Sequence, residues 1–168
     1  MRASALERWL RGSVGVILLL AASIAGAQEG VGALRYSPKL APNPGLAPEQ
    51  VVRIQLDALR NNDSEDRGFE VAFRFASPAN RVNTGPLSRF IRMIRQGPYS
   101  LMLDYENAAY HPVEIIENRA RQRVTLIGAG LAVDYEFYLS RQPDGEWQGC
   151  WMTDAVVAKR PHGLQVQS

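Results

Sequence analysis

The segment VDYEFYLS, residues 133–140, alternates strictly between two kinds of side chain. Successive side chains of a β-strand point to opposite faces of a sheet. One face is therefore expected to carry Val133, Tyr135, Phe137 and Leu139, and the other Asp134, Glu136, Tyr138 and Ser140. This pattern predicts a strand with one face on a hydrophobic core and the other in water.

Four neighbouring segments, residues 99–105, 113–118, 122–127 and 147–157, are also rich in β-branched and aromatic residues, which strands favour. No helical pattern interrupts them, so an antiparallel sheet is expected. Between the last two strands, Asp144-Gly145 suits a hairpin turn with positive φ. Trp147 and Trp151 lie four residues apart in the last segment, which predicts that both lie on the same face of that strand. Packing in the core is expected, and an exposed interface or stacking platform for a ring-shaped ligand is the alternative.

The preceding residues, 48–97, have helical periodicity. Pro48 suits a first helical position, and Val52, Leu56 and Leu59 form one apolar face. Ser64 is expected to cap a second helix, which ends at Ser77-Pro78 and is followed by a loop through Gly85. A third helix is expected from about Pro86 to Gly97. Helices followed by a strand meander predict an α+β fold.

Short motifs in a fixed order cover most of residues 48–157. They are Gln55-x-x-Ala58-Leu59, Asp63, Ala72-Phe73-x-Phe75-Ala76-Ser77-Pro78, Phe90-x-x-Met93-Ile94, Tyr99 and Asp144-Gly145-x-Trp147. With these motifs the chain resembles an uncharacterised, mostly exported bacterial family, the domain of unknown function 4864. More broadly, it resembles the nuclear-transport-factor-2-like (cystatin-like) superfamily. The resemblance implies N-terminal helices packed on a curled antiparallel sheet, together forming a cone, and it implies no catalytic residue.

The first 27 residues have the pattern of a secretory signal peptide. Arg2, Arg8 and Arg11 precede an apolar run, residues 14–25, and Ala25-Gly26-Ala27 suits a signal-peptidase site. The apolar run is shorter than the ~20 residues of a membrane span. We expect cleavage after Ala27 and export to the periplasm or the medium, without stable membrane insertion; a leader retained as a short anchor is the alternative.

The remaining chain divides into three parts. Residues 28–47 contain three prolines and three glycines and are predicted to be a linker. Residues 48–157 form the predicted domain, and residues 158–168 a flexible tail.

Charge and cysteine content narrow the classes of function. The chain has 19 basic and 17 acidic residues; without the leader's three arginines and one glutamate, 16 of each remain. A neutral domain argues against non-specific nucleic-acid binding. The single cysteine, Cys150, excludes an intramolecular disulfide, and a buried core thiol is its expected role.

A cone lined by a sheet would form a pocket, and two carboxylates, Asp104 and Asp134, are weak candidates for a catalytic acid inside it. The strand alternation favours a solvent-facing position for Asp134, so no catalytic residue is assigned. The expected ligand-binding side chains are Tyr135, Phe137, Phe73, Phe90 and Trp151.

Other candidate motifs favour structural roles. Arg89, Arg92 and Arg95 recur every third residue; a solvated helix flank is expected, and an anion- or partner-binding strip is the alternative. The two histidines have no spacing that fits a zinc site. No metal and no cofactor are expected, and no nucleotide-binding loop is present.

Three functions are consistent with these patterns. The first is a non-catalytic module of the cell envelope that binds a small apolar ligand or an envelope protein. The second is an isomerase- or lyase-like enzyme that uses one buried acid. The third is a structural subunit that forms a homodimer through its sheet.

Overall fold

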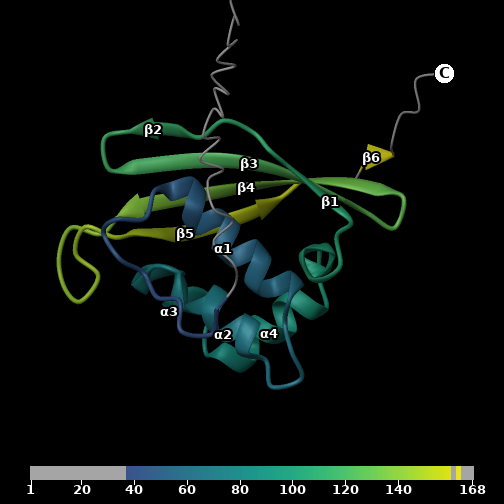
Figure 1. Ribbon diagram of the computed structural model, residues 1–168, viewed down its shortest axis with the longest axis horizontal. Helices are drawn as coiled ribbons and strands as arrows, with labels where there is room; N and C mark the ends of the chain where they lie inside the picture. The colour runs from purple at the N-terminus through teal and green to yellow at the C-terminus, as the bar shows by residue number, and fades with distance from the viewer. Residues whose placement is uncertain (1–36, 160–161, 164–168) are drawn as a thin grey trace, which may run out of the picture. The chain divides into compact units, whose positions relative to one another are not determined.

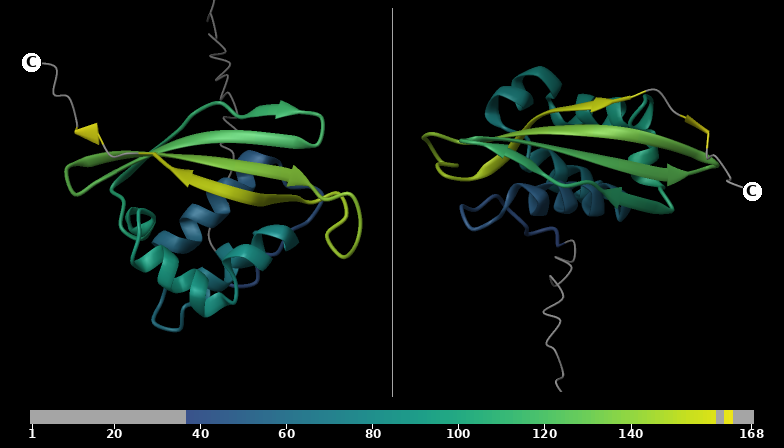
Figure 2. Two further views of the ribbon diagram at one scale, coloured as in Figure 1. Left: turned by 180° about the vertical axis from the view of Figure 1, so that it is seen from behind. Right: turned by 90° about the horizontal axis from the view of Figure 1, so that it is seen from above.

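The computed structural model describes residues 37–159 and 162–163. It contains four α-helices, one 3₁₀ turn and six strands: α1 (Pro48–Arg60), α2 (Arg67–Arg74), α3 (Pro78–Thr84), α4 (Leu87–Arg95), η1 (Ser100–Leu103), β1 (Asn107–Tyr110), β2 (Glu114–Ile116), β3 (Arg119–Gly128), β4 (Leu131–Arg141), β5 (Trp151–Ala158) and β6 (His162–Gly163). The helices precede the strands and lie on one side of the sheet (Figure 1), as views from behind and from above also show (Figure 2). The predicted α+β class is confirmed.

The sheet is antiparallel throughout and open, with strand order β1-β3-β4-β5. β2 extends the β1 edge along β3, and β6 pairs with β4. The hairpin of β3 and β4 is the longest pairing, from Arg119↔Ser140 to Gly128↔Leu131. This register directs the alternating residues of β4 as the sequence predicts.

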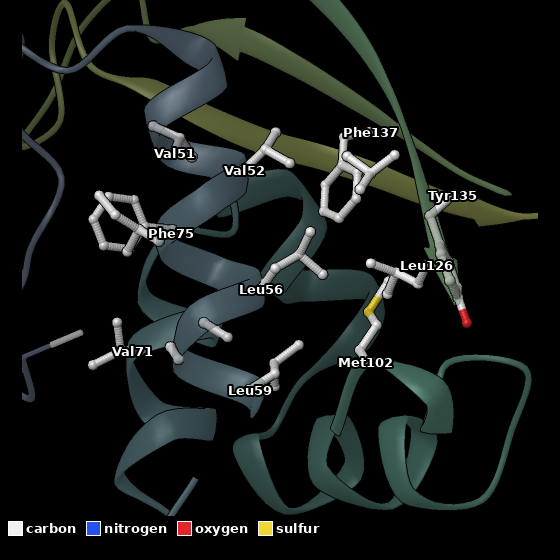
Figure 3. Packing of buried hydrophobic residues seen from close by; sticks show 14 of the residues in the cluster. Val51, Val52, Leu56, Leu59, Val71, Phe75, Met102, Leu126, Tyr135 and Phe137 are labelled. Atoms are coloured by element: carbon white, nitrogen blue, oxygen red, sulfur yellow. The ribbon is translucent and has the colours of Figure 1, made fainter. Parts of the chain in front are cut away.

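The inner face of β4 packs against the helices. Val133, Tyr135, Phe137 and Leu139 are all at most 5% exposed. Figure 3 shows Tyr135 and Phe137 extending from the sheet toward Leu56 and Met102 in the helical layer. One hydrophobic cluster joins α1, α2, η1, β3 and β4, so neither layer has a separate core.

Helix α1 begins at Pro48 as predicted, and its expected apolar face, Val52, Leu56 and Leu59, is buried. It packs closely on α2 at Gly68, where a Cβ would come within 2.1 Å of the Ala58 carbonyl oxygen. Only glycine therefore permits this approach of the two helices.

The second predicted helix is shorter than expected, and the predicted cap is wrong. The residue preceding α2 is Asp66 rather than Ser64, and α2 ends at Arg74. The chain then forms a parallel bridge between Ala76 and Thr153 of β5. Local periodicity could not indicate this long-range pairing.

Helix α3 was expected to be a loop. Ser77 caps it, since its Oγ accepts a hydrogen bond from the Asn80 N–H at 3.2 Å, and Pro78 occupies the first turn. None of its residues is buried. It therefore lacks the apolar stripe on which helix prediction depends.

Two strand predictions need correction. Residues 100–103, inside the predicted strand 99–105, form η1; Met102 in this turn and Tyr105 just after it are buried in the core. The first strand is instead β1, whose sequence NAAY has few strand-favouring residues. It is held by pairing with residues 124–127 of β3.

The last strand begins at Trp151, four residues later than predicted. Trp147 lies in the connection between β4 and β5, so the two tryptophans do not share a strand face as expected. The positive φ predicted for the Asp144-Gly145 turn is present, since Gly145 has φ +74°. The connection is longer than the tight hairpin expected from Asp144-Gly145.

The expected linker is described only from residue 37, and this part is packed against the domain. Leu40 and Leu46 contact the core cluster, and the Arg74 guanidinium donates to the carbonyl oxygens of Leu40 and Pro38 at 2.6 and 3.1 Å. The predicted signal peptide and most of the predicted tail lie outside the described residues.

Candidate functional site

A pocket of about 250 Å³ lies between the helices and the inner face of β4 and β5. Every helix, η1 and both strands contribute to its wall. The apolar lining residues are Leu56, Leu59, Ala72, Ala76, Phe90, Met93, Ile94, Tyr99, Met102, Phe137, Ala155 and Val156, and the polar ones are Gln55, Asn80, Asn83, Thr84, Thr153 and Asp154. Asn83 and Ala155 are exposed, so the pocket opens to solvent beside α3 and β5.

Two buried polar side chains in the wall satisfy one another. The Thr153 hydroxyl donates to Gln55 Oε1 at 2.6 Å, and Gln55 Nε2 donates to the Ala72 carbonyl oxygen at 2.9 Å. Gln55 is 7% and Thr153 1% exposed. These two hydrogen bonds connect α1, α2 and β5. They also satisfy the Thr153 hydroxyl and the Gln55 amide, which are the buried polar groups of this wall.

The rim is polar and comes mainly from α3. Asn80, Asn83 and Thr84 follow the spacing of one helix face, and Asn80 Nδ2 donates to the Thr153 carbonyl oxygen at 3.0 Å. On the opposite wall, the Tyr99 hydroxyl donates to the Val156 carbonyl oxygen at 3.0 Å. These two bonds attach the rim to the edge of β5 that lies away from β4.

A β-bulge lies where β5 borders the pocket. Thr153 pairs with Leu139 and Ala155 with Tyr138, so Asp154 is one extra residue on β5. Bulges change the direction of side chains and are frequent next to functional sites. Here the bulge interrupts the simple alternation of β5 and places Asp154, a partly buried residue, in the pocket lining.

Two of the five predicted ligand-binding residues, Phe137 and Phe90, line the pocket. Tyr135 lies two residues before Phe137 on β4, outside the pocket lining, and its hydroxyl donates to the Pro98 carbonyl oxygen at 2.8 Å. Phe73 is half-buried on the flank of Phe90, with ring centroids 5.2 Å apart. Trp151 is buried at the start of β5, before the segment that borders the pocket.

Neither predicted carboxylate lies in the pocket. Asp104 is exposed directly after η1, because that segment forms a 3₁₀ turn instead of a strand. Asp134 lies on the outer face of β4, as strand alternation requires. There it accepts a hydrogen bond from the Thr125 hydroxyl at 2.5 Å and lies 3.8 Å from the Arg123 guanidinium.

The outer face of the sheet carries a network of paired polar side chains. His111 contacts Thr125 at 3.0 Å and Arg123 at 3.2 Å, Arg121 binds Glu114 at 3.0 Å, and Lys159 lies 3.3 Å from Glu136. The Tyr138 hydroxyl also donates to Glu136 at 2.7 Å, and this hydrogen bond is the main reason that the pKa of Glu136 is lowered. These groups satisfy one another on the outer face.

The other residues considered from the sequence are the single cysteine, the three arginines of α4 and possible metal ligands. Cys150 is buried, and burial raises the pKa of its thiol, which disfavours the reactive thiolate. Arg89, Arg92 and Arg95 are all exposed, and Arg95 forms an ion pair with Asp66 at 2.6 Å. In residues 37–159 and 162–163, no group of three or more His, Cys, Asp or Glu residues is placed to hold a metal ion.

Sequence reasoning missed the polar part of the site. Gln55 comes from α1, Asn80 from α3, and Thr153 and Asp154 from β5, and only the packing of α1 and α3 on β5 brings these three elements together. One signal was present: Asp154 interrupts the apolar run of the last strand, MTDAVV. Among the described residues, no helix combines the length and the hydropathy required to cross a membrane.

Comparison with known proteins identifies a family without an assigned activity. Neither the curated proteins nor the solved structures contain a match to the chain. A family model matches residues 46–159, which include α1 to β5 and the whole pocket. The chain therefore belongs to the family described as a domain of unknown function (DUF4864).

Proposed function

We propose that this protein is an exported, non-catalytic module that binds a small, mainly apolar molecule in the pocket between α1, α4 and β5. The pocket itself carries the proposal. Protein interiors are close-packed, and voids much larger than a water molecule are few. A space of about 250 Å³ with mostly apolar walls exceeds the ~150 Å³ engineered cavity that binds benzene.

The chemistry of the wall supports binding rather than catalysis. The inward polar groups of Gln55 and Thr153 already bond each other, and the Tyr99 proton is donated to the backbone. Phe90, Met93 and Tyr99, which are only partly buried, supply apolar contact area for a ligand. Export is part of the proposal and is based on the leader pattern of residues 1–27.

A binding assay with the uncharged fluorescent probe N-phenyl-1-naphthylamine tests the proposal. The mature chain from Gln28 should bind the probe in the folded state, with a rise in fluorescence. Ala72→Leu places extra side-chain volume in the pocket wall and should abolish the signal. Ala109→Leu, at an exposed position of β1, is the matched control and should retain it.

Urea titration of both variants verifies that they fold. Probe binding that is equal in wild type and in folded Ala72→Leu would exclude this pocket as the binding site. The export component has its own measurement: N-terminal sequencing of the protein from a periplasmic or secreted fraction should begin at Gln28.

An isomerase- or lyase-like enzyme is the second candidate. One observation favours it: Asp154 brings a carboxylate to the pocket, although Asp104 and Asp134 do not. We rank it second because the lining contains no histidine and no second carboxylate to act as a partner in proton transfer.

A further inference from the structure

Asp154 is the charged residue in an otherwise neutral pocket lining. It is partly buried, at the bulge of β5. Among residues 37–159, no hydrogen bond and no ion pair involves its side chain, whereas Asp134 and Glu136 on the neighbouring strand both have cationic partners. A partly buried carboxylate without a partner favours a positively charged group beside it.

The groups around Asp154 suit a cation as well. The side-chain amides of Asn80 and Asn83 and the hydroxyl of Thr84 offer oxygen acceptors along the same rim. Phe90 and Tyr99 line the wall, and aromatic faces attract ammonium groups. No Lys or Arg lines the pocket to compete for the carboxylate.

We propose that the pocket selects amphipathic amines, whose apolar body lies among Phe90, Met93, Tyr99 and Val156 and whose ammonium group binds Asp154 at the bulge. This inference rests on the proposed function and specifies the class of ligand. The alkyl body gains from burial in the apolar wall. The ammonium gains a charge-assisted hydrogen bond in a partly desolvated site.

The test compares three ligands that share one alkyl chain: octylamine, octanol and octanoate. The assay measures how well each ligand displaces N-phenyl-1-naphthylamine from the mature protein at neutral pH, where octylamine is a cation and octanoate an anion. Wild type should prefer octylamine over octanol by about fivefold, with octanoate the weakest. Asp154→Asn should bind octanol as wild type does and lose the preference for the amine.

Asp144→Asn is the matched control. It removes the same charge from an exposed position in the connection between β4 and β5, so it should keep the full preference for octylamine. If wild type binds the three ligands equally, or if folded Asp154→Asn keeps the preference, the amine inference is overturned while the pocket proposal stands. If wild type does not bind the probe at all, the proposed function fails, and this inference fails with it.

Discussion

Gln55 and Thr153 show how two polar side chains are accommodated in an apolar wall. Each is nearly inaccessible to solvent, and each uses the other as a partner. Their net contribution to stability is modest while both are present, but either group becomes costly when it loses its partner.

Thr153→Val tests this pair. The change keeps the shape of the side chain but leaves Gln55 Oε1 buried without a donor. We expect the free energy of unfolding in urea to fall by about 1–3 kcal/mol. Thr84→Val removes a half-buried hydroxyl bonded to the Asn80 carbonyl oxygen and should lower the free energy of unfolding by less. An equal loss in both variants would contradict a special cost of breaking the buried Gln55–Thr153 pair.

The buried phenol of Tyr135 should make the stability of the protein depend on pH in the alkaline range. Burial, with a smaller effect of Tyr99, raises the pKa of its phenol to about 12. Below about pH 10 the phenol is neutral in both the folded and the unfolded chain, so its contribution to stability is complete there. Above that pH the unfolded chain loses the proton first, so stability falls by up to about 2–3 kcal/mol as the pH approaches 12.

Tyr135→Phe tests that effect. The variant should lose about 1 kcal/mol at neutral pH, because the Pro98 carbonyl oxygen loses its donor. Its stability should then decline less steeply than that of wild type in urea titrations above about pH 10. The decline should not vanish, since the pKa values of Tyr105 and Tyr110 are also raised by burial. Parallel curves for the two proteins would argue against this role for Tyr135.

At the scale of elements, the β3–β4 hairpin has a two-residue turn in which one residue, Ala129, does not suit its backbone conformation. Ala129 and Gly130 join the strands with φ values of +51° and +74°, a pattern typical of a two-residue hairpin turn. Glycine adopts this conformation freely at the second position. Alanine at the first is strained, because its Cβ disfavours positive φ.

Ala129→Gly should therefore stabilise the protein. We expect the free energy of unfolding to rise by about 0.5–1 kcal/mol, after allowing for the greater freedom of glycine in the unfolded chain. Ala79→Gly, at an exposed position of α3, is the opposite control and should lower stability by a similar amount. A thermal or urea melt that shows Ala129→Gly to be destabilising would rule out strain at this turn.

At the scale of the whole molecule, helices and sheet share one core. The hydrophobic cluster contains Leu56 and Phe69 from the helices together with Val124 and Phe137 from the strands. The Gln55–Thr153 bond adds a polar link between residues 98 positions apart. Neither layer can bury its apolar face without the other.

A chain that begins at Gln28 should therefore unfold in a single cooperative transition. Far-ultraviolet circular dichroism, near-ultraviolet circular dichroism and tryptophan fluorescence should give the same urea midpoint. Loss of tertiary signal at a lower urea concentration than secondary structure would show that the helices and the sheet unfold separately.

The outline of the fold was predictable from local patterns. The strict alternation of residues 133–140 specifies which side chains of β4 face the core, and the periodicity of Val52, Leu56 and Leu59 specifies the buried face of α1. These patterns are reliable because burial acts on each residue of a regular element in turn. The same patterns place Phe90 and Phe137 on inward faces, and both residues line the pocket.

Tertiary contacts decided the rest. Helix α3 has no apolar stripe, β1 is held by its pairing with β3, and residues 100–103 form a 3₁₀ turn despite their apolar sequence. The polar side of the pocket also depends on tertiary contacts, because Asp154 lies at a bulge that the register of β5 on β4 defines. The sequence by itself determined which faces are apolar. Only packing between distant segments determined where those faces leave a space, because a pocket is a property of several elements at once.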